Sequence, residues 1–263
     1  MRKSIQILGW SITIITLVLV SFTGLSIYSL VKTLGIDYGL SFGELSYRSL
    51  ENGFTLTIPI RLNNTGYFEV TDLQFNTTIH DVKGYELTTA ASSIPKVRIG
   101  STEKRVHNIT ITLRDIIDKD LTYLLFNNTE IIMDHFLKFR YAYVYSYQID
   151  VPDNPLEWGA PFHNLTITQT TYDPSRRQLI IHLYFQNESL MIINGTLRII
   201  VYNDEGDRIG LGSMNVRLEP GYIFHEGVRI NVEEPSLLSE RGSVNLYFEA
   251  EGASFGPVVI SYE

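Results

Sequence analysis

The chain has 263 residues, a net charge of −8 and no cysteine. Without cysteine it forms no disulfides, thiolate metal sites or catalytic thiols. Nucleic-acid binding needs a basic surface, so the negative charge predicts no nucleic-acid partner. Aromatic residues make up 12% of the chain, which favours β-structure.

The N-terminal segment is apolar. Residues 4–31 contain no charged side chain, and about 20 apolar residues in a helix are enough to cross a bilayer. A cleaved signal peptide is the alternative, but its apolar core is shorter, about 7–15 residues, and a small-x-small cleavage site follows it. No Ala-x-Ala-like site follows this run. We therefore predict an uncleaved signal anchor over residues 1–35, in contact with the lipid bilayer through residues 4–31.

The charges that flank this segment predict its orientation. Arg2 and Lys3 precede it, and only Lys32 follows it closely. Because basic residues stay on the cytoplasmic side of a membrane, we expect the N-terminus in the cytoplasm. The predicted localisation is the cell membrane, with the bulk of the chain extracellular.

Acceptor sites for N-glycosylation, Asn-x-Ser/Thr, agree with this orientation. The chain has seven of them, more than its Ser and Thr content predicts by chance, and all follow the apolar segment. A sugar transferase on the outer side could reach them there, and each needs an exposed Asn on a turn or an outward strand face. The candidates are Asn63, Asn76, Asn108, Asn127, Asn164, Asn187 and Asn194.

Two stretches of the chain, residues 56–87 and 178–211, share an order of features. Each has an alternating apolar strand, an Asn-rich turn, a second strand and a Gly turn. Gly84 and Gly206 are 122 residues apart, and a second pair of turn glycines keeps a spacing of 121. Near-constant spacing is typical of an internal duplication.

The predicted fold class is mainly β: an N-terminal transmembrane helix followed by two tandem immunoglobulin-like β-sandwiches, because the strands alternate with period two. The first sandwich is expected over residues 36–150 and the second over 163–263. The segment between them, 151–162, is rich in Pro and is predicted to be a linker. Residues 114–137 carry apolar side chains at helical spacing, which predicts a short helical insertion in the first sandwich.

The Asn-rich turns at Asn63-Asn64 and Asn187, the segment DLQFNTTIHDVKGYEL, the short helix and the final strand resemble a known domain. It is the water-stress and hypersensitive-response domain, the second class of late-embryogenesis-abundant proteins. The resemblance covers residues 38–150 and, more weakly, 163–263. It implies immunoglobulin-like sandwiches with a short helix, membrane anchoring and an archaeal source, and it carries over no catalytic residues.

Motifs for catalysis or cofactor binding are missing from the sequence. The six His residues form no His-x₃-His pair and no His-Glu-x-x-His run, so zinc chemistry has little support. No nucleophile elbow, P-loop or dinucleotide-binding Gly pattern is present. Asp115, Asp118 and Asp120 are expected to stabilise a helix N-terminus rather than hold Ca²⁺. We therefore predict a protein that is not an enzyme, with no cofactor, metal or catalytic residues.

Residues 139–147 form an aromatic run, FRYAYVYSY. On a single strand its odd positions would lie on one face. An exposed ladder of Tyr141, Tyr143, Tyr145 and Tyr147 could stack on a ligand such as a sugar, or the same rings could pack in the sandwich core with their hydroxyls at the rim. The residues between the rings, Arg140, Ala142, Val144 and Ser146, are small or mixed and suit the outer face of the strand. We therefore favour packing of the rings in the core.

These features predict a non-catalytic cell-surface glycoprotein that presents two β-sandwich modules for structural, protein or ligand interaction, with a protein or cell-envelope partner. Two alternatives remain open. The family resemblance implies a stress-protective, chaperone-like protein. The anchor is also compatible with an accessory subunit of a membrane or surface-layer assembly.

Overall fold

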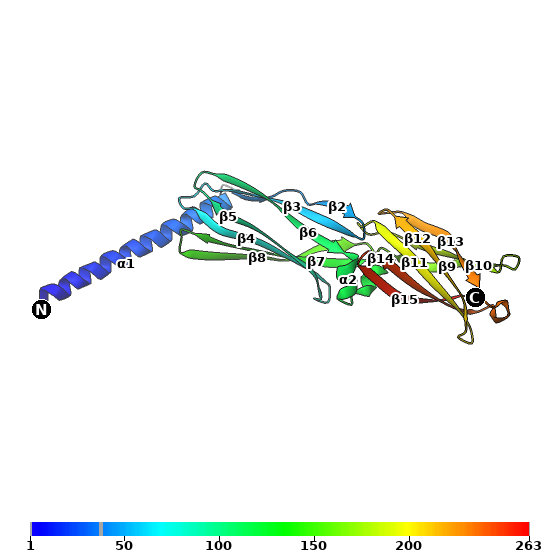
Figure 1. Cartoon of the computed structure of the whole chain (residues 1–263). Helices are drawn as coiled ribbons and strands as arrows, with labels where there is room; N and C mark the ends of the chain where they lie inside the picture. The colour runs from blue at the N-terminus through cyan, green and yellow to red at the C-terminus, as the bar shows by residue number, and fades with distance from the viewer. Residues whose placement is uncertain (1, 37–38, 263) are drawn as a thin grey trace.

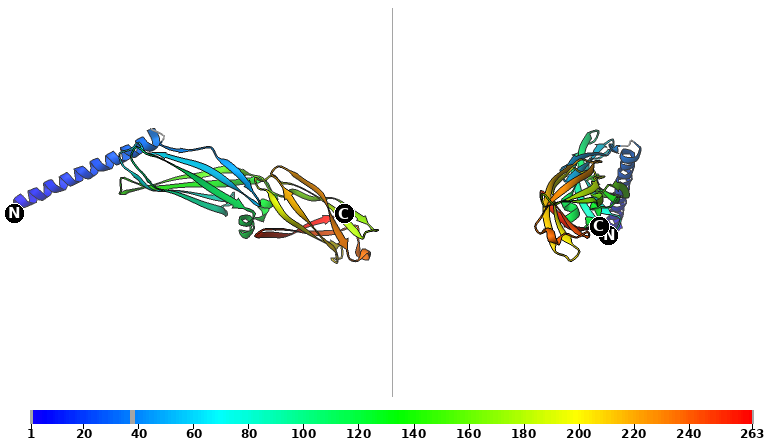
Figure 2. Two further views of the ribbon diagram at one scale, coloured as in Figure 1. Left: turned by 45° about the horizontal axis from the view of Figure 1, so that its top comes forward. Right: turned by 90° about the vertical axis from the view of Figure 1, so that its right-hand side faces the viewer.

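The computed structural model describes residues 2–36 and 39–262. A long N-terminal helix and two β units follow one another in an elongated molecule, with the C-terminus in the second unit (Figure 1; Figure 2). The predicted fold class is confirmed, because the chain is mainly β, with an apolar N-terminal helix and antiparallel sheets.

Helix α1, Arg2–Val31, continues into a π-helical turn, Lys32–Ile36. Its stretch Trp10–Leu34 is long and apolar enough to cross a membrane, with a mean hydropathy of 2.1. Side chains from residue 10 to 21 are exposed, but the last turns of the helix contact the first β unit. Part of the predicted lipid-contacting segment, 4–31, is therefore covered by protein rather than by lipid. The covered side chains in this segment are Phe22, Thr23, Ser26, Ser29 and Leu30.

The first β unit is built from two sheets. In one sheet, β3 lies between β6 on one side and the short strands β1 and β2 on the other, and the second sheet has the order β5-β4-β7-β8. The strands are β1 Leu40–Phe42, β2 Ser46–Leu50, β3 Gly53–Asn63, β4 Val70–Asp81, β5 Glu86–Val97, β6 Thr102–Thr112, β7 Thr129–Tyr141 and β8 Tyr145–Trp158.

Alternation along the strands forms the core between these sheets. On β3, Phe54, Leu56 and Ile58 are buried, whereas the residues between them are partly exposed. On β4, Leu73 and Phe75 are buried in the same way. Burying each side chain of this size stabilises the fold by about 1.5–3 kcal/mol.

The second β unit is a single seven-stranded sheet with the order β15-β14-β11-β12-β13-β10-β9. Only two residue pairs, Gly210↔Val232 and Leu211↔Asn231, join β12 to β13, so the pairing is weakest at the middle of the sheet. The strands are β9 His163–Asp173, β10 Gln178–Gln186, β11 Ile193–Asn203, β12 Arg208–Leu218, β13 Ile223–Val232, β14 Gly242–Ala250 and β15 Ala253–Tyr262.

Strand pairing supports the duplication that the sequence predicts. β3 lies between β6 and the pair β1 and β2, as β10 lies between β13 and β9. β4 lies between β5 and β7, as β11 lies between β12 and β14, and β8 pairs with β7 as β15 pairs with β14. The two units therefore have matching strand connections.

The Asn-rich turns match in atomic detail. The amide Nδ2 of Asn64 donates to the carbonyls four and 33 residues further along the chain. Asn187 donates to the carbonyls four and 31 residues further along. The N–H of Gly100 donates to the carbonyl of Asn64, and that of Gly221 to Asn187. The equivalent of Asn187 in the first unit is therefore Asn64 and not Asn63.

The segment 151–162 is not a free linker. Residues 151–158 form the second half of β8, which stays paired with β7 up to Thr129↔Trp158. The Pro residues are accommodated because β8 is an edge strand. On the open side of an edge strand there is no neighbouring strand, so the missing N–H of Pro loses no hydrogen bond there. Only residues 159–162 lie between the strands of the two units, and the domain limits 36–150 and 163–263 stay predictions.

The helical insertion is shorter than the predicted segment 114–137. It consists of α2, Leu113–Asp118, and a 3-10 turn, Thr122–Leu125, after which β7 begins. Thr112 and Asp115 form a capping box at the start of α2, so Asp115 has the expected role at the helix N-terminus. Asp118 is instead the last residue of α2 and Asp120 lies beyond it, so the expectation is wrong for these two. Beyond residue 128 the buried positions alternate with period two, so the strand pattern prevails over helical spacing.

Candidate functional site: an apolar cleft in the first β unit

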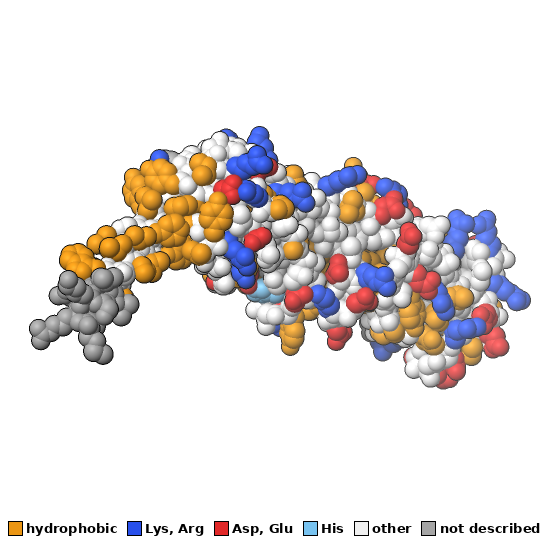
Figure 3. Space-filling model, turned by 60° about the vertical axis from the view of Figure 1, so that its left-hand side comes forward, with side chains coloured by type: hydrophobic (Ala, Val, Ile, Leu, Met, Phe, Trp, Pro, Cys, Tyr) orange, Lys and Arg blue, Asp and Glu red, His pale blue; other side chains and the backbone are white. Residues whose placement is uncertain are grey.

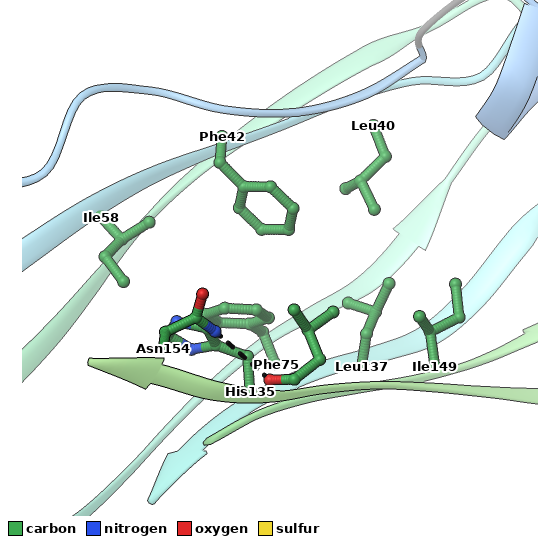
Figure 4. Close-up of a pocket in the computed structure, with 9 residues that line it drawn as sticks. Leu40, Phe42, Ile58, Phe75, His135, Leu137, Ile149 and Asn154 are labelled. Atoms are coloured by element: carbon green, nitrogen blue, oxygen red, sulfur yellow. Dashed lines mark hydrogen bonds between the residues drawn. The ribbon is translucent and has the colours of Figure 1, made fainter. Parts of the chain in front are cut away.

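A cleft of about 310 Å³ opens between the edges of the two sheets in the first β unit (Figure 4). β1 pairs with β3 and β8 pairs with β7, so β1 and β8 are the edge strands that border it. Leu40, Phe42 and Ile58 lie on one side and face Leu137 and Ile149 on the other (Figure 4). The full lining is Leu40, Phe42, Ile58, Phe75, His135, Leu137, Ile149, Val151 and Asn154.

Pro59 explains why this edge of the sandwich is interrupted. The carbonyl of Pro59 accepts from the N–H of Gly43, so the backbone of Pro59 faces the edge strand, where its missing N–H removes a ladder bond. The edge strand breaks opposite it: β1 ends at Phe42 and β2 starts at Ser46. A Cβ at Gly43 would lie 2.9 Å from the Pro59 ring, so glycine is the residue that fits there.

The cleft has a buried base and an accessible mouth. Ile58, Phe75 and Leu137 are at most 8% exposed, whereas Phe42 is 49% and Val151 46% exposed. The rings of Phe42 and Phe75 lie 5.4 Å apart. Hydrocarbon therefore lines the cleft from mouth to base, and an apolar group that enters the cleft exchanges contact with water for contact with this lining.

Two polar side chains mark one end of the cleft. The Nδ2 of Asn154 donates long hydrogen bonds, 3.4 Å each, to the carbonyls of Met133 and Val151. The ring of His135 stacks on Phe75 with centroids 5.4 Å apart. A bound group could therefore make one or two hydrogen bonds in an otherwise apolar site.

His135 begins a chain of hydrogen bonds that runs behind the cleft. Its Nδ1 lies 2.9 Å from the hydroxyl of Thr77, which lies 3.0 Å from Nε2 of His107. Nδ1 of His107 lies 2.8 Å from the hydroxyl of Ser92. These contacts satisfy polar groups that the core would otherwise leave unpaired.

Burial controls the charge of this chain. Burial, with a smaller contribution from the neighbouring His135, lowers the pKa of His107 to about 4. Burial also lowers the pKa of His135, although the carboxylate of Asp134 opposes this. Both rings are therefore neutral near pH 7, and the cleft presents no charge from them.

The contact between Ser92 and His107 differs from a hydrolase triad. In a triad, a carboxylate holds the second ring nitrogen of the His, whereas here Thr77 occupies that position. His107 is also fully buried. Among residues 2–36 and 39–262, no three His, Asp or Glu side chains come together in a way that could hold a metal ion.

The aromatic run 139–147 is a hairpin and not a single strand. β7 ends at Tyr141, residues 142–144 form the turn, and β8 starts at Tyr145. Tyr141 is buried, Tyr143 is 68% exposed at the turn, and Tyr145 and Tyr147 are partly buried. Pairing of Tyr141 with Tyr145 and of Phe139 with Tyr147 keeps Tyr141, Tyr145 and Tyr147 on one face of the hairpin, but this face is partly or fully buried and Tyr143 lies apart from it in the turn. The four tyrosines therefore do not form the exposed ladder that the single-strand interpretation predicts.

The hydroxyls of this hairpin contact helix α1. Tyr141 OH shares a hydrogen bond with Ser29 Oγ, and Tyr145 OH shares one with Thr23 Oγ1. The Oγ of Ser29 also accepts from the N–H of Tyr67 at 2.7 Å. Packing is thus the role of Tyr141, as the favoured interpretation held, but its hydroxyl contacts the helix instead of the rim of the sandwich.

The seven glycosylation candidates differ in exposure. Six of them keep part of their surface in solvent, so an attached sugar would find room. Asn108, Asn127 and Asn164 are exposed, and Asn63, Asn76 and Asn194 are partly exposed.

Asn187 is the exception, and its prediction as a glycosylation site is wrong. Its side chain is fully buried, and both hydrogens of its Nδ2 are donated to backbone carbonyls. A sugar on Nδ2 would break these bonds and has no room in this fold. The amide holds the turn together, as Asn64 does in the first unit.

Reasoning from the sequence missed the cleft. Its lining comes from segments between residues 40 and 154 that lie far apart along the chain, and each reads as ordinary strand pattern. The only local signal was Pro59 in the middle of a strand with a glycine, Gly43, in the segment before it.

Comparisons with known proteins identify no family. No family model matches the sequence, and no curated protein matches it. Among solved structures, the putative ApaA protein from Bordetella pertussis is 10% identical with a TM-score of 0.28, over 46% of this chain and 95% of that one. A Mobiluncus mulieris adhesin is 10% identical with a TM-score of 0.29, over 79% and 80% of the two chains. Red sea bream transglutaminase is 10% identical with a TM-score of 0.25, over 86% and 32%. Such scores identify neither a family nor an activity.

Proposed function

We propose that this chain is a non-catalytic protein of the cell surface, anchored by α1, which presents two β units as one rigid rod outside the membrane. The observation that carries the proposal is the docking of α1. Its exposed apolar turns project from the rod, and its last turns are bonded to the first unit through Ser29 and Thr23. An anchor held in this way fixes the direction in which the rod stands.

The flanking charges support an extracellular position for the rod. Arg2 and Lys3 before the helix favour a cytoplasmic N-terminus. Six of the seven glycosylation candidates lie on surfaces that could carry sugar. The bulk of the chain is then a glycoprotein module outside the cell.

The cleft gives this module a means of interaction. It suits an apolar side chain or acyl group that belongs to a protein or cell-envelope partner, since its lining is hydrocarbon with one amide and one neutral imidazole at the end. Burial of one group of Leu size would contribute about 1.5–3 kcal/mol. The apolar lining of the cleft supports a binding role.

Protease treatment of intact cells tests the topology. Externally added protease should degrade the region 39–262, while a tag before residue 2 stays protected until the membrane is opened. Protection of the β units in intact cells would refute the proposal. Carbonate extraction gives a second check, because an anchored chain stays in the membrane pellet.

Pull-down from cell-envelope extracts tests the cleft. Val151→Asp places a charge at its mouth, and Val259→Asp places the same charge on β15, the equivalent edge strand of the second unit, where Val259 is 61% exposed. We expect Val151→Asp to lose a partner that the wild type and Val259→Asp retain. Equal capture by all three would exclude the cleft. A stable multi-subunit complex that survives in Val151→Asp would favour the accessory-subunit role.

The cleft also supports the stress-protective alternative that the resemblance to late-embryogenesis-abundant domains implies, because it could hold apolar segments of unfolding proteins. Membership of that family and an archaeal source remain part of this second proposal. The chain in lipid nanodiscs should then reduce light scattering by a heat-denatured client protein, and Val151→Asp should abolish the effect while Val259→Asp keeps it.

A further inference from the structure

Three loops of the first β unit lie at the end where α1 leaves it (Figure 1). Register places them together, because Val70 pairs with both Val97 and Tyr141. The loops that follow or precede these residues are 64–69, 98–101 and 142–144. The opposite end of the unit contacts the second unit, since Phe162 donates to the carbonyl of Leu125 and Glu188 to that of Ala160.

These loops expose large hydrophobic side chains, here called the apolar tip. Tyr67 is 48% exposed, Ile99 56%, and Tyr143 and Val144 are each 68% exposed. Hydrophobic side chains gather at this end of the unit beside the helix (Figure 3). Single exposed hydrophobic residues are common, but several on neighbouring loops mark a surface that something covers.

The turn of the β7–β8 hairpin is costly for the residues it contains. Ala142 has φ of 54° and Tyr143 has φ of 66°, a left-handed conformation that Gly and Asn adopt at lower cost. Each such residue costs about 1–2 kcal/mol. Gly or Asn at positions 142 and 143 would lower this cost, so the tyrosine and the valine beside it point to a role outside the fold.

The length of α1 identifies what covers the tip. Phe22 is the first helix residue in contact with the unit, with its ring 5.4 Å from Phe68 and 6.2 Å from Tyr145. The uncharged residues 4–21 extend beyond that contact, and at 1.5 Å per residue they span about 27 Å. This is close to the thickness of a bilayer's hydrocarbon core, about 30 Å, so with Arg2 and Lys3 at the inner boundary the outer boundary of the core falls near Phe22, level with the hairpin turn.

We propose that the apolar tip lies in the headgroup layer of the outer leaflet and holds the first unit against the lipid around α1. Tyrosine suits this layer because its ring is apolar and its hydroxyl is wet. Lys32 lies 5.7 Å from the ring of Tyr67, where its amine can reach lipid phosphates. Beside the tip, the carboxylate of Glu69 forms an ion pair with Nζ of Lys96 at 2.6 Å. Glu69 therefore presents no unpaired negative charge to the lipid. This inference rests on the proposed anchoring by α1.

Site-directed spin labelling tests the proposal, since the chain has no cysteine of its own. Single variants Val144→Cys, Ile15→Cys and Val259→Cys of the full chain, each carrying a nitroxide, are reconstituted in phosphatidylcholine vesicles. Collision with oxygen, which is concentrated in lipid, is compared with collision with a water-soluble nickel complex. The oxygen-to-nickel ratio at 144 should exceed that at 259 several-fold and lie below that at 15. Adding Tyr67→Ser, Ile99→Ser and Tyr143→Ser should reduce the ratio at 144 to the value at 259.

The labels at positions 144, 15 and 259 distinguish the proposal of the apolar tip from the proposal that α1 is a membrane anchor. A label in lipid at 15 with an aqueous label at 144 would overturn the apolar tip and leave the anchor intact. An aqueous label at 15 would overturn both. A label at 144 that neither reagent reaches would mean that a second copy of the chain covers the tip, and would also overturn the inference.

Discussion

His107 shows how one buried side chain couples the fold to pH. Burial lowers its pKa to about 4, whereas in the unfolded chain it takes up a proton near pH 6.5. The unfolded state therefore binds more protons as pH falls, and the stability held above pH 6.5 is lost progressively between about pH 6.5 and 4.

We expect His107→Gln to weaken this pH dependence, because Gln can keep hydrogen bonds to Thr77 and Ser92 but does not titrate. The fall in melting temperature between pH 7 and pH 4.5, measured on the full chain in detergent, should be smaller in the variant than in the wild type. His225→Gln, at an exposed position, serves as the control and should behave like the wild type. An unchanged slope in His107→Gln would show that other groups control the acid transition.

Asn127 and Asn187 carry the same acceptor motif in opposite surroundings. Asn127 is exposed after the 3-10 turn, whereas Asn187 is buried with both amide hydrogens bonded. Asn127→Gln should therefore remove one glycan in the native host. Asn187→Gln should remove none, yet should lower stability by about 1–3 kcal/mol, because it displaces the amide from two buried carbonyls.

Gel mobility before and after deglycosylation measures the loss of a glycan in Asn127→Gln, and the melting temperature measures the loss of stability in Asn187→Gln. Loss of a glycan from Asn187→Gln would contradict the turn geometry described above.

Among the structural elements, the contact between α1 and the loop before β4 depends on Gly66. A Cβ at this position would lie 2.2 Å from Tyr141 Oη and 2.6 Å from Thr33 Oγ1. The backbone of the loop can therefore approach the helix only without a side chain. The second unit, which carries no helix at this turn, has Ser189 at the matching position.

Gly66→Ala is expected to loosen the end of α1, with a cost of about 1–3 kcal/mol for the overpacked contact. Trypsin should then cut faster after Lys32 when the protein is held in detergent. Gly24→Ala is the matched control, because nothing lies within 4 Å of a Cβ at Gly24, and its cleavage rate should stay at the wild-type value. Equal rates in both variants would mean that the helix is not held by this loop.

Several elements could be predicted from the sequence because their signals are local. The uncharged run 4–31 predicts the helix, the period-two alternation predicts most strands, and the turn glycines at matching distances predict the duplication. Thr112 and Asp115 stand three residues apart, and they form the cap of α2. The helix, the strands and the cap depend on neighbours within a few residues, whereas the duplication is found by comparing two stretches of the chain with each other.

The elements that failed prediction depend on which strands pair and how the sheets are placed, and no local pattern of residue types specifies this. Aromatic residues alternate without a break through 139–147, because Tyr141 and Tyr145 are paired across a three-residue turn. This turn contains no Gly or Asn that would mark a reversal of the chain. Residues 151–158 look like a linker because of their Pro, but pairing with β7 makes them a strand. The cleft depends on the separation of two edge strands, for which no single stretch of sequence carries a signal.

At the scale of the whole molecule, the two units share buried contacts. The N–H of Phe162 donates to the carbonyl of Leu125 in the first unit. Its ring lies 5.2 Å from Phe185 and 5.1 Å from Phe248 in the second. On the opposite side, Asn52 exchanges hydrogen bonds with the backbone of residue 194. The rod therefore has contacts on two sides of the junction that resist bending.

This shared core predicts how the protein unfolds. Wild-type chain in detergent should lose both β units in one calorimetric transition, because neither can open without exposing the aromatic cluster around Phe162. Phe162→Ala removes the ring at the centre of that cluster and should destabilise the protein by about 3–5 kcal/mol, lowering the transition as a whole or dividing it in two. Val259→Ala, at an exposed position, should leave the transition unchanged. Two separate transitions already in the wild type would mean that the units are independent and that the rod bends at residues 159–162.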